Sequence, residues 1–367
     1  MAPVRAGRDR PADHPCSSGK GVASALGTQT KRSARQTPED RSSPGMGAGR
    51  REVEYNLVTR GRRIAAAALV LYPLAFLEQA AAADTAQERL GYTATARVLV
   101  LHADDLGMSH SVNVATFDAL EKGWITSASI LVPCPWFPEV ARFAQAHPNV
   151  DLGIHLALTS EWTTFRWGPV AGRSAVPSLL DASGYLPPEV GPVVANVKAD
   201  EAERELRAQI EMARHAGVKI SHLDSHMFAL IRSAPLIEVY RRLSRQYGIP
   251  AMIARDVELP AGTPSLGSEA LIDRVVGLEA GVPLGEWRAA YEKVLAPLGP
   301  GVYELIVHLG HAGEEMQGAT SDHPDWGAAW RQADLDLVSS QEFQHFLTDQ
   351  GFILVNWRQL AKARKQD

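Results

Sequence analysis

The sequence predicts an α/β fold, a deformed or incomplete barrel of parallel β-strands joined by α-helices. From Val98 onward, short apolar runs alternate with longer stretches of helical periodicity. Such apolar runs are typical of parallel strands buried on both faces, and the longer stretches are typical of the helices that connect them. The seven runs are fewer than the strands of a complete barrel of this type, so the barrel is expected to be open.

The expected strands share a core of aliphatic residues and a polar residue at or near one end. They cover residues 98–102, 127–132, 151–158, 219–223, 250–254, 305–308 and 352–356.

Between the strands we expect helices such as residues 200–215. Leu206, Ile210 and Ala213 share one face of this helix, Asp200 is expected to cap its start, and Gly217 is expected to close its end.

Two longer segments, 159–191 and 260–287, interrupt the alternation and follow strand ends. Loops after strands form the active sites of barrel enzymes, so we expect both to wall a substrate pocket. Trp162 and Trp167 lie in the first segment, where stacking on a sugar ring and packing are both open. Trp326 and Trp330 are four residues apart, which predicts that they share one helix face and pack.

The chain divides into a leader and a folded domain. Residues 1–59 are rich in Arg, Ser, Pro and Gly and are expected to be disordered, and Met46 is an alternative start. Residues 60–83 are expected to be a signal peptide, 84–97 a linker, and 98–367 the catalytic barrel domain.

The signal-peptide hypothesis depends on three consecutive regions. Arg60, Arg62 and Arg63 precede the apolar run 64–77, and small residues end at Ala83, where we expect cleavage. The sequence therefore predicts export to the periplasm or the exterior, and the adjacent arginines permit the twin-arginine route. The run is shorter than the roughly 20 residues that span a bilayer, so an uncleaved membrane anchor is the alternative.

Charge and cysteine content exclude several classes of function. The first 63 residues carry 13 Lys and Arg against 6 Asp and Glu, whereas the rest carry 24 against 36. An acidic domain argues against a nucleic-acid or membrane partner and favours a neutral or cationic small substrate. Cys16 and Cys134 are the only cysteines, so we expect no disulfide framework and no cysteine zinc site, and a buried thiol at Cys134.

Polar residues lie late in, or just after, four of the expected strands: Asp104 and Asp105, His155, His226, and His308. Each has an ordinary explanation, because a carboxylate can cap a helix and a buried histidine can bond a backbone carbonyl. Parallel strands end on one rim, however, so these groups are expected to meet. Histidine with carboxylate is a ligand set suited to a divalent metal ion. His102 and His222 lie further back, and we assign them no role.

Three motifs carry a resemblance to a known family: residues 103–107 (ADDLG) with Ser109 and Asn113, residues 153–156 (GIHL), and residues 222–226 (HLDSH). Together they resemble the YdjC-like carbohydrate deacetylases, the ChbG/HpnK family, from about Val98 to the C-terminus. The resemblance implies a NodB/YdjC-like deformed barrel.

The resemblance also implies a metal-dependent hydrolase that removes N-acetyl groups from carbohydrates containing amino sugars, such as chito-oligosaccharides. Its ligand roles fall on Asp105, His155 and His226. Three ligands leave positions for a water molecule and a carbonyl oxygen. Asp104 is then the expected general base, and His308 is the candidate proton donor to the departing amine, although it could instead orient a ligand or line the pocket.

The cofactor is expected to be one divalent metal ion, zinc or magnesium, with zinc the better match to two imidazoles. Met227 and Phe228 follow His226 where chito-oligosaccharide members often carry further histidines, so the sugar stays open. The oligomeric state, a homodimer included, is also open. Two alternatives remain at this point: a non-haem iron oxygenase using the same three ligands, and a non-catalytic exported sugar-binding barrel.

Overall fold

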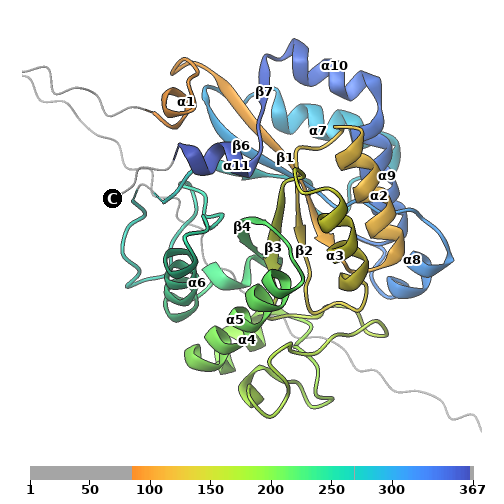
Figure 1. Ribbon diagram of the computed structural model, residues 1–367. Helices are drawn as coiled ribbons and strands as arrows, with labels where there is room; N and C mark the ends of the chain where they lie inside the picture. Colours follow the sequence, from red (N-terminus) through yellow and green to blue (C-terminus); the bar gives the residue numbers. More distant parts are fainter. Residues whose placement is uncertain (1–84, 268, 364–367) are drawn as a thin grey trace, which may run out of the picture. The chain divides into compact units, whose positions relative to one another are not determined.

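The computed structural model describes residues 85–267 and 269–363 (Figure 1). The expected leader (1–59), the signal peptide (60–83), the alternative start at Met46 and the cleavage point after Ala83 lie outside the described residues. Within the described part, no helix has the length and apolar character needed to cross a bilayer.

The described residues form one sheet of seven strands in the order β4-β3-β2-β1-β6-β5, with β7 paired to β1 beside this path. Every strand pair is parallel, which confirms the expected α/β architecture. The strands are β1 (Arg97–Leu106), β2 (Ser127–Ile130), β3 (Leu152–Leu156), β4 (Ile220–Ser225), β5 (Arg274–Val276), β6 (Gly301–Val307) and β7 (Phe352–Leu354).

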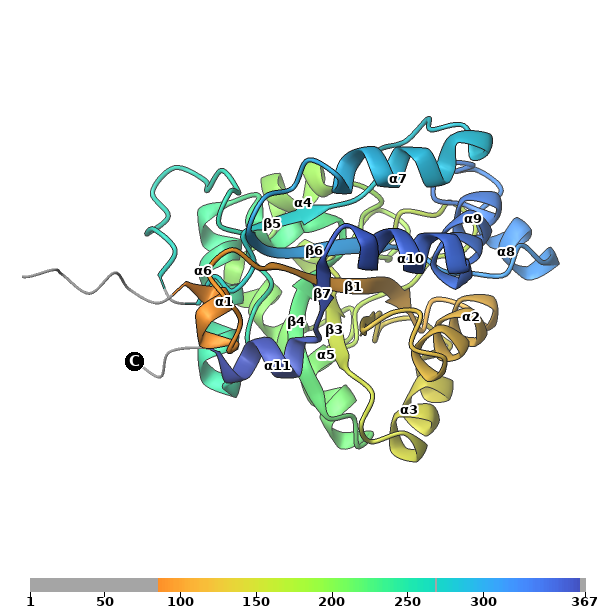
Figure 2. The same ribbon diagram turned by 90° about the horizontal axis from the view of Figure 1, so that it is seen from above.

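Helices lie around the outside of the curved sheet (Figures 1 and 2). They are α1 (Ala86–Arg89), α2 (His110–Glu121), α3 (Phe137–Ala146), α4 (Val190–Asn196), α5 (Ala199–His215), α6 (Ala234–Tyr247), α7 (Trp287–Leu295), α8 (Glu314–Ala319), α9 (Ala328–Ser339), α10 (Gln341–Asp349) and α11 (Trp357–Lys362), with 3₁₀ turns η1 (Pro177–Leu179), η2 (His226–Ile231) and η3 (Leu284–Glu286).

The barrel is incomplete where a strand was expected at 250–254. Only two isolated bridges occur here, Leu223 with Ala251 and Ala254 with Ile272. The segment changes partner within three residues, from β4 to the chain before β5, so it never makes the consecutive pairs of a strand. The expected loop 260–287 is also wrong in part, because it contains β5.

Helix α5 confirms the expected helix, with its start corrected. Its N-cap is Lys198, which makes no side-chain cap, while Asp200 lies in the first turn and there favours the helix dipole. Gly217 follows the C-cap with φ +80, as expected of the residue that closes a helix.

The expected linker is part of the folded domain from Thr85 onward. Thr85 and Glu88 form a capping box at α1, and Ala86 and Ala96 are buried in a hydrophobic cluster with Val98 of β1. Residues 85–96 therefore pack on the sheet and belong to the folded domain, although they precede its first strand.

Alternation along β1 explains how the barrel interior becomes polar. Val98 and Val100 join a buried cluster with Val302, whereas Leu99 and Leu101 belong to the larger cluster. Because successive side chains of a strand point to opposite faces, the next residues on the Val98 side are the buried His102 and Asp104. The interior therefore changes from apolar to polar toward the carboxyl ends of the strands.

Candidate active site

A bulge in β1 brings two adjacent aspartates to one pocket. The register of β1 against β2 shifts between Ala103 and Leu106, and Asp105 has φ +65. In a regular strand, neighbouring side chains would face opposite sides of the sheet. The left-handed conformation, which aspartate tolerates better than most residues, turns the chain so that Asp104 and Asp105 both line the pocket.

The structure brings Asp105, His155 and His226 together, as the strand ends predict. His226 Nδ1 lies 3.1 Å from His155 Nε2, and Asp105 Oδ1 lies 3.6 Å from each of these two nitrogens. All three side chains are buried and line the pocket.

These atoms fit a single divalent cation. Bonds of about 2.1 Å at tetrahedral angles place ligand atoms about 3.4 Å apart, close to the separations observed. Asp105 Oδ1 is buried and has no hydrogen-bond partner among the described residues, which is costly for a carboxylate oxygen unless a cation binds it. These three residues could therefore hold a metal ion.

Two overlapping groups of possible ligands fit less well. One joins Asp224 to His102 and His222, and these three do not line the pocket. The other joins Asp104, His155 and Asp224, but Asp224 already accepts a hydrogen bond from His155.

Asp105 has a second partner that comes from far along the chain. Arg331 of α9 is buried and donates from Nη2 to Asp105 Oδ2 over 2.6 Å. Burial opposes ionisation of Asp105, yet the guanidinium of Arg331, with nearby histidines, lowers the pKa of this carboxyl below its usual range. The ion pair also leaves Oδ1, rather than Oδ2, facing the two histidines.

A carboxylate lies behind each histidine. His155 Nδ1 is 2.7 Å from Asp224 Oδ1, and His226 Nε2 is 2.9 Å from Glu161 Oε2. Although burial acts against a charged imidazole, the carboxylates of Asp224 and Asp104 raise the pKa of His155 to about 10. An environment that stabilises an imidazolium so strongly would also stabilise a bound metal cation.

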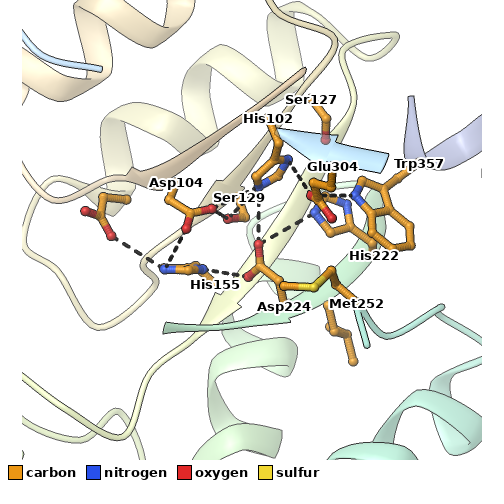
Figure 3. Close-up of polar contacts among 12 residues, drawn as sticks. His102, Asp104, Ser127, Ser129, His155, His222, Asp224, Met252, Glu304 and Trp357 are labelled. Carbon is orange, nitrogen blue, oxygen red and sulfur yellow. Dashed lines mark hydrogen bonds and ion pairs between the residues drawn. The ribbon is translucent and has the colours of Figure 1, made fainter. Parts of the chain in front are cut away.

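Figure 3 shows a further group of polar side chains around His102. Its Nε2 lies 3.2 Å from Asp104 Oδ1 and 3.2 Å from Asp224 Oδ2, and its Nδ1 lies 3.5 Å from Glu304 Oε1. Burial lowers the pKa of His102, but these carboxylates outweigh it and raise the pKa well above its ordinary value. His102 thus contacts the two carboxylates next to the candidate metal ligands.

His308 lies at the rim, directly after β6, as expected. Its Nε2 is 3.9 Å from Asp104 Oδ2, and its backbone N–H donates to Asp334 Oδ2 over 2.8 Å. Burial lowers the pKa of His308, although nearby aspartates oppose this. The imidazole therefore faces the carboxylate expected to act as the general base.

The pocket over these residues has a volume of about 650 Å³, and the two long segments wall it. Glu161, Trp162 and Glu189 come from segment 159–191, and Val276 and Glu279 come from segment 260–287. This placement confirms the expectation that both segments line the site.

The two pairs of tryptophans have different outcomes. Trp167 is buried and donates from Nε1 to the Thr159 carbonyl, so it packs in the core, whereas Trp162 is 1% exposed and lines the pocket. Trp326 precedes α9 and has φ +57, so the prediction of a shared helix face with Trp330 is wrong. The predicted packing is confirmed, because the two rings lie with centroids 5.2 Å apart. The ring of Trp326, 37% exposed, also lines the pocket.

The YdjC-like family model matches residues 98–349. The chain belongs to the YdjC-like family. It is 34% identical over 284 residues to a carbohydrate deacetylase of Thermus thermophilus, covering 75% of this chain and 98% of the relative. It is 28% identical over 271 residues to a carbohydrate deacetylase of Brevibacillus brevis, covering 72% and 99%.

A solved structure from Enterococcus faecalis V583, named for a provisional role in cellobiose-phosphate cleavage, shares the fold of this YdjC-like chain. Its TM-score is 0.60 at 24% identity, with 72% of this chain and 99% of that chain covered.

Sequence reasoning missed three residues that contact the cluster in this YdjC-like protein. Asp224 stands inside the HLDSH motif, and its place two residues before the expected ligand His226 could have identified it. Glu161 and Arg331 lie in a loop and a distant helix, and no local pattern points to either.

Proposed function

We propose that this YdjC-like protein is a metal-dependent carbohydrate deacetylase that removes N-acetyl groups from carbohydrates containing amino sugars. The observation that carries the proposal is the buried cluster of Asp105, His155 and His226 at a pocket that Asp104 also lines. The names of the two relatives above, matched over 98% and 99% of their lengths, support the deacetylase activity.

Asp105, His155 and His226 would hold the metal ion. When bound, a divalent ion acidifies a water molecule and polarises an amide carbonyl. Two imidazoles and one carboxylate favour zinc over magnesium, which prefers oxygen ligands.

Asp104 would accept the proton of the attacking water. The Ser129 hydroxyl donates to its Oδ1 over 3.4 Å, and His102 lies 3.2 Å from the same oxygen. These contacts hold one oxygen and leave Oδ2 on the side of His155 and His308. His308, on that side, would give a proton to the departing amine.

The test is acetate release by the full-length protein, supplied with zinc or magnesium, from a panel of N-acetylated oligosaccharides. Asp104→Asn should lower the rate by about 10²- to 10⁴-fold, the usual contribution of a general base, while metal binding persists. Asp118→Asn is the matched control, because Asp118 is an exposed residue paired with Lys122.

No acetate from any member of the panel, or an Asp104→Asn variant as active as the wild type, would contradict the proposal. Oxygen consumption that depends on a 2-oxoacid and added iron would instead support the oxygenase.

We also propose export by the segment 60–83. Secretion from the native host with a mature N-terminus at Asp84 is expected, and recovery of the uncleaved chain in the membrane fraction would support the anchor instead.

A further inference from the structure

Glu161 contacts the candidate metal ligand His226 from the wall of the pocket. It lies in the segment that follows β3, its side chain is 17% exposed, and its Oε2 is 2.9 Å from His226 Nε2. The contact joins a loop that lines the pocket to a residue directly after β4.

The two histidines present different nitrogens to the centre. His226 directs Nδ1 toward His155 and Asp105, whereas His155 directs Nε2 there. Each ring therefore has its other nitrogen on a carboxylate, Glu161 for His226 and Asp224 for His155. A flip of either ring about its Cβ–Cγ bond would turn a ring carbon to the centre and break the contact with the carboxylate.

The backbone directly after His226 has an uncommon conformation. Met227 and Phe228, the next two residues, have φ of +52 and +54, a conformation that non-glycine residues rarely adopt. The chain thus turns sharply just after His226, and Glu161 supplies a side-chain restraint from outside that turn.

We infer that Glu161 is a positioning residue that holds His226 with Nε2–H on its carboxylate and Nδ1 free for the metal. The inference rests on the proposed metal site. A carboxylate behind a ligand histidine selects the tautomer, orients the ring and makes the ligand nitrogen more basic. Glu161 belongs to the segment 159–191 that walls the pocket. Its contact with His226 therefore makes the metal affinity of the site depend on that segment.

The experiment is a competition titration of the metal-free full-length protein with zinc, using wild type, Glu161→Ala and Glu161→Gln. Loss of such a carboxylate typically lowers metal affinity about 10- to 100-fold, which is the effect expected for Glu161→Ala. Glu161→Gln should lose less, because its amide oxygen still accepts Nε2–H and its shape is preserved.

Glu189→Gln is the matched control. Glu189 lines the same pocket, and its side chain makes no hydrogen bond or ion pair to the other described residues. It removes one carboxylate from the pocket without touching either imidazole, so zinc affinity should stay at the wild-type value.

The second measurement is NMR of the His226 ring in the zinc-loaded protein, which identifies the metal-bound nitrogen. Nδ1 is expected in the wild type, and coordination through Nε2 would overturn the inference. Equal zinc affinity in wild type and both Glu161 variants would also overturn it, even if activity fell, because Glu161 would then act on the substrate. A wild type that binds no zinc would overturn the proposed metal site itself.

Discussion

Gly153 of β3 packs against the ring of His222, so Gly153→Ala inserts a methyl group where no space exists. An ideal Cβ at Gly153 would lie 2.3 Å from His222 Cε1, 2.4 Å from Nε2 and 2.6 Å from Nδ1. The ring cannot retreat, because its other face stacks on the fully buried Trp357, with ring centroids 4.8 Å apart and planes at 14°. Overpacking typically costs about 1–3 kcal/mol and occasionally more, and we expect at least the upper end, about 3 kcal/mol.

The assay is urea unfolding followed by tryptophan fluorescence, with thermal unfolding as a second measure. A loss of this size corresponds to a fall in Tm of roughly 6 °C or more. Gly318→Ala is the control, because Gly318 lies in α8 with no atom near its would-be Cβ, and alanine favours a helix. If Gly153→Ala costs the same in a His222→Ala background as in the wild type, the clash is not the cause.

Two further predictions concern buried carboxyl groups. Burial raises the pKa of Glu304 from 4.5 to about 7, so its contribution to stability is full below pH 4.5 and is lost as pH rises through 7. Glu304→Gln should therefore gain stability relative to wild type over this window, by at most about 3 kcal/mol, and a stability difference independent of pH would refute the linkage. Asp334 accepts hydrogen bonds from Trp287, Tyr291 and the His308 backbone, all buried or partly buried. Asp334→Ala leaves three donors without this acceptor and should cost about 3 kcal/mol or more by urea unfolding, whereas a loss below about 1 kcal/mol would contradict this account.

The site residues at the strand ends were predictable because strands buried on both faces are nearly continuous apolar runs in the sequence. In such strands a charged or imidazole side chain is conspicuous, and the carboxyl ends of parallel strands share one rim. From these two facts the sequence predicts that Asp105, His155, His226 and His308 lie close together. The prediction of a strand at 250–254 was wrong. An apolar run in the sequence does not show that this segment pairs first with β4 and then with the chain before β5.

Geometry within a residue or two was less predictable. Adjacent aspartates in a regular strand cannot both face one pocket, and only the bulge with Asp105 at positive φ allows it. A sequence pattern shows the two carboxyl groups but not the bulge. Similarly, Trp326 and Trp330 have helical spacing, yet the helix begins only at Ala328.

Contacts between distant segments lay beyond any local pattern. Arg331 pairs with Asp105 across 226 residues, and Glu161 pairs with His226 across 65. Exposed arginines and glutamates are common, so neither residue was conspicuous in its own segment. Their importance follows from burial, which makes a charge costly unless a partner compensates for it.

The same argument, that a buried charge is costly without a partner, explains the position of His102. Asp104, Asp224 and Glu304 are buried around it and carry no guanidinium or ammonium partner among their described contacts. Buried carboxyl groups packed this closely favour a cation beside them, and His102 can supply one because they raise its pKa against the opposing effect of burial. An imidazolium at His102 would lie 3.2 Å from a carboxylate oxygen of Asp104 and 3.2 Å from one of Asp224. His102, to which the sequence assigned no role, is therefore the residue that joins Asp104 of β1 to Asp224 of β4 beside the cluster of Asp105, His155 and His226.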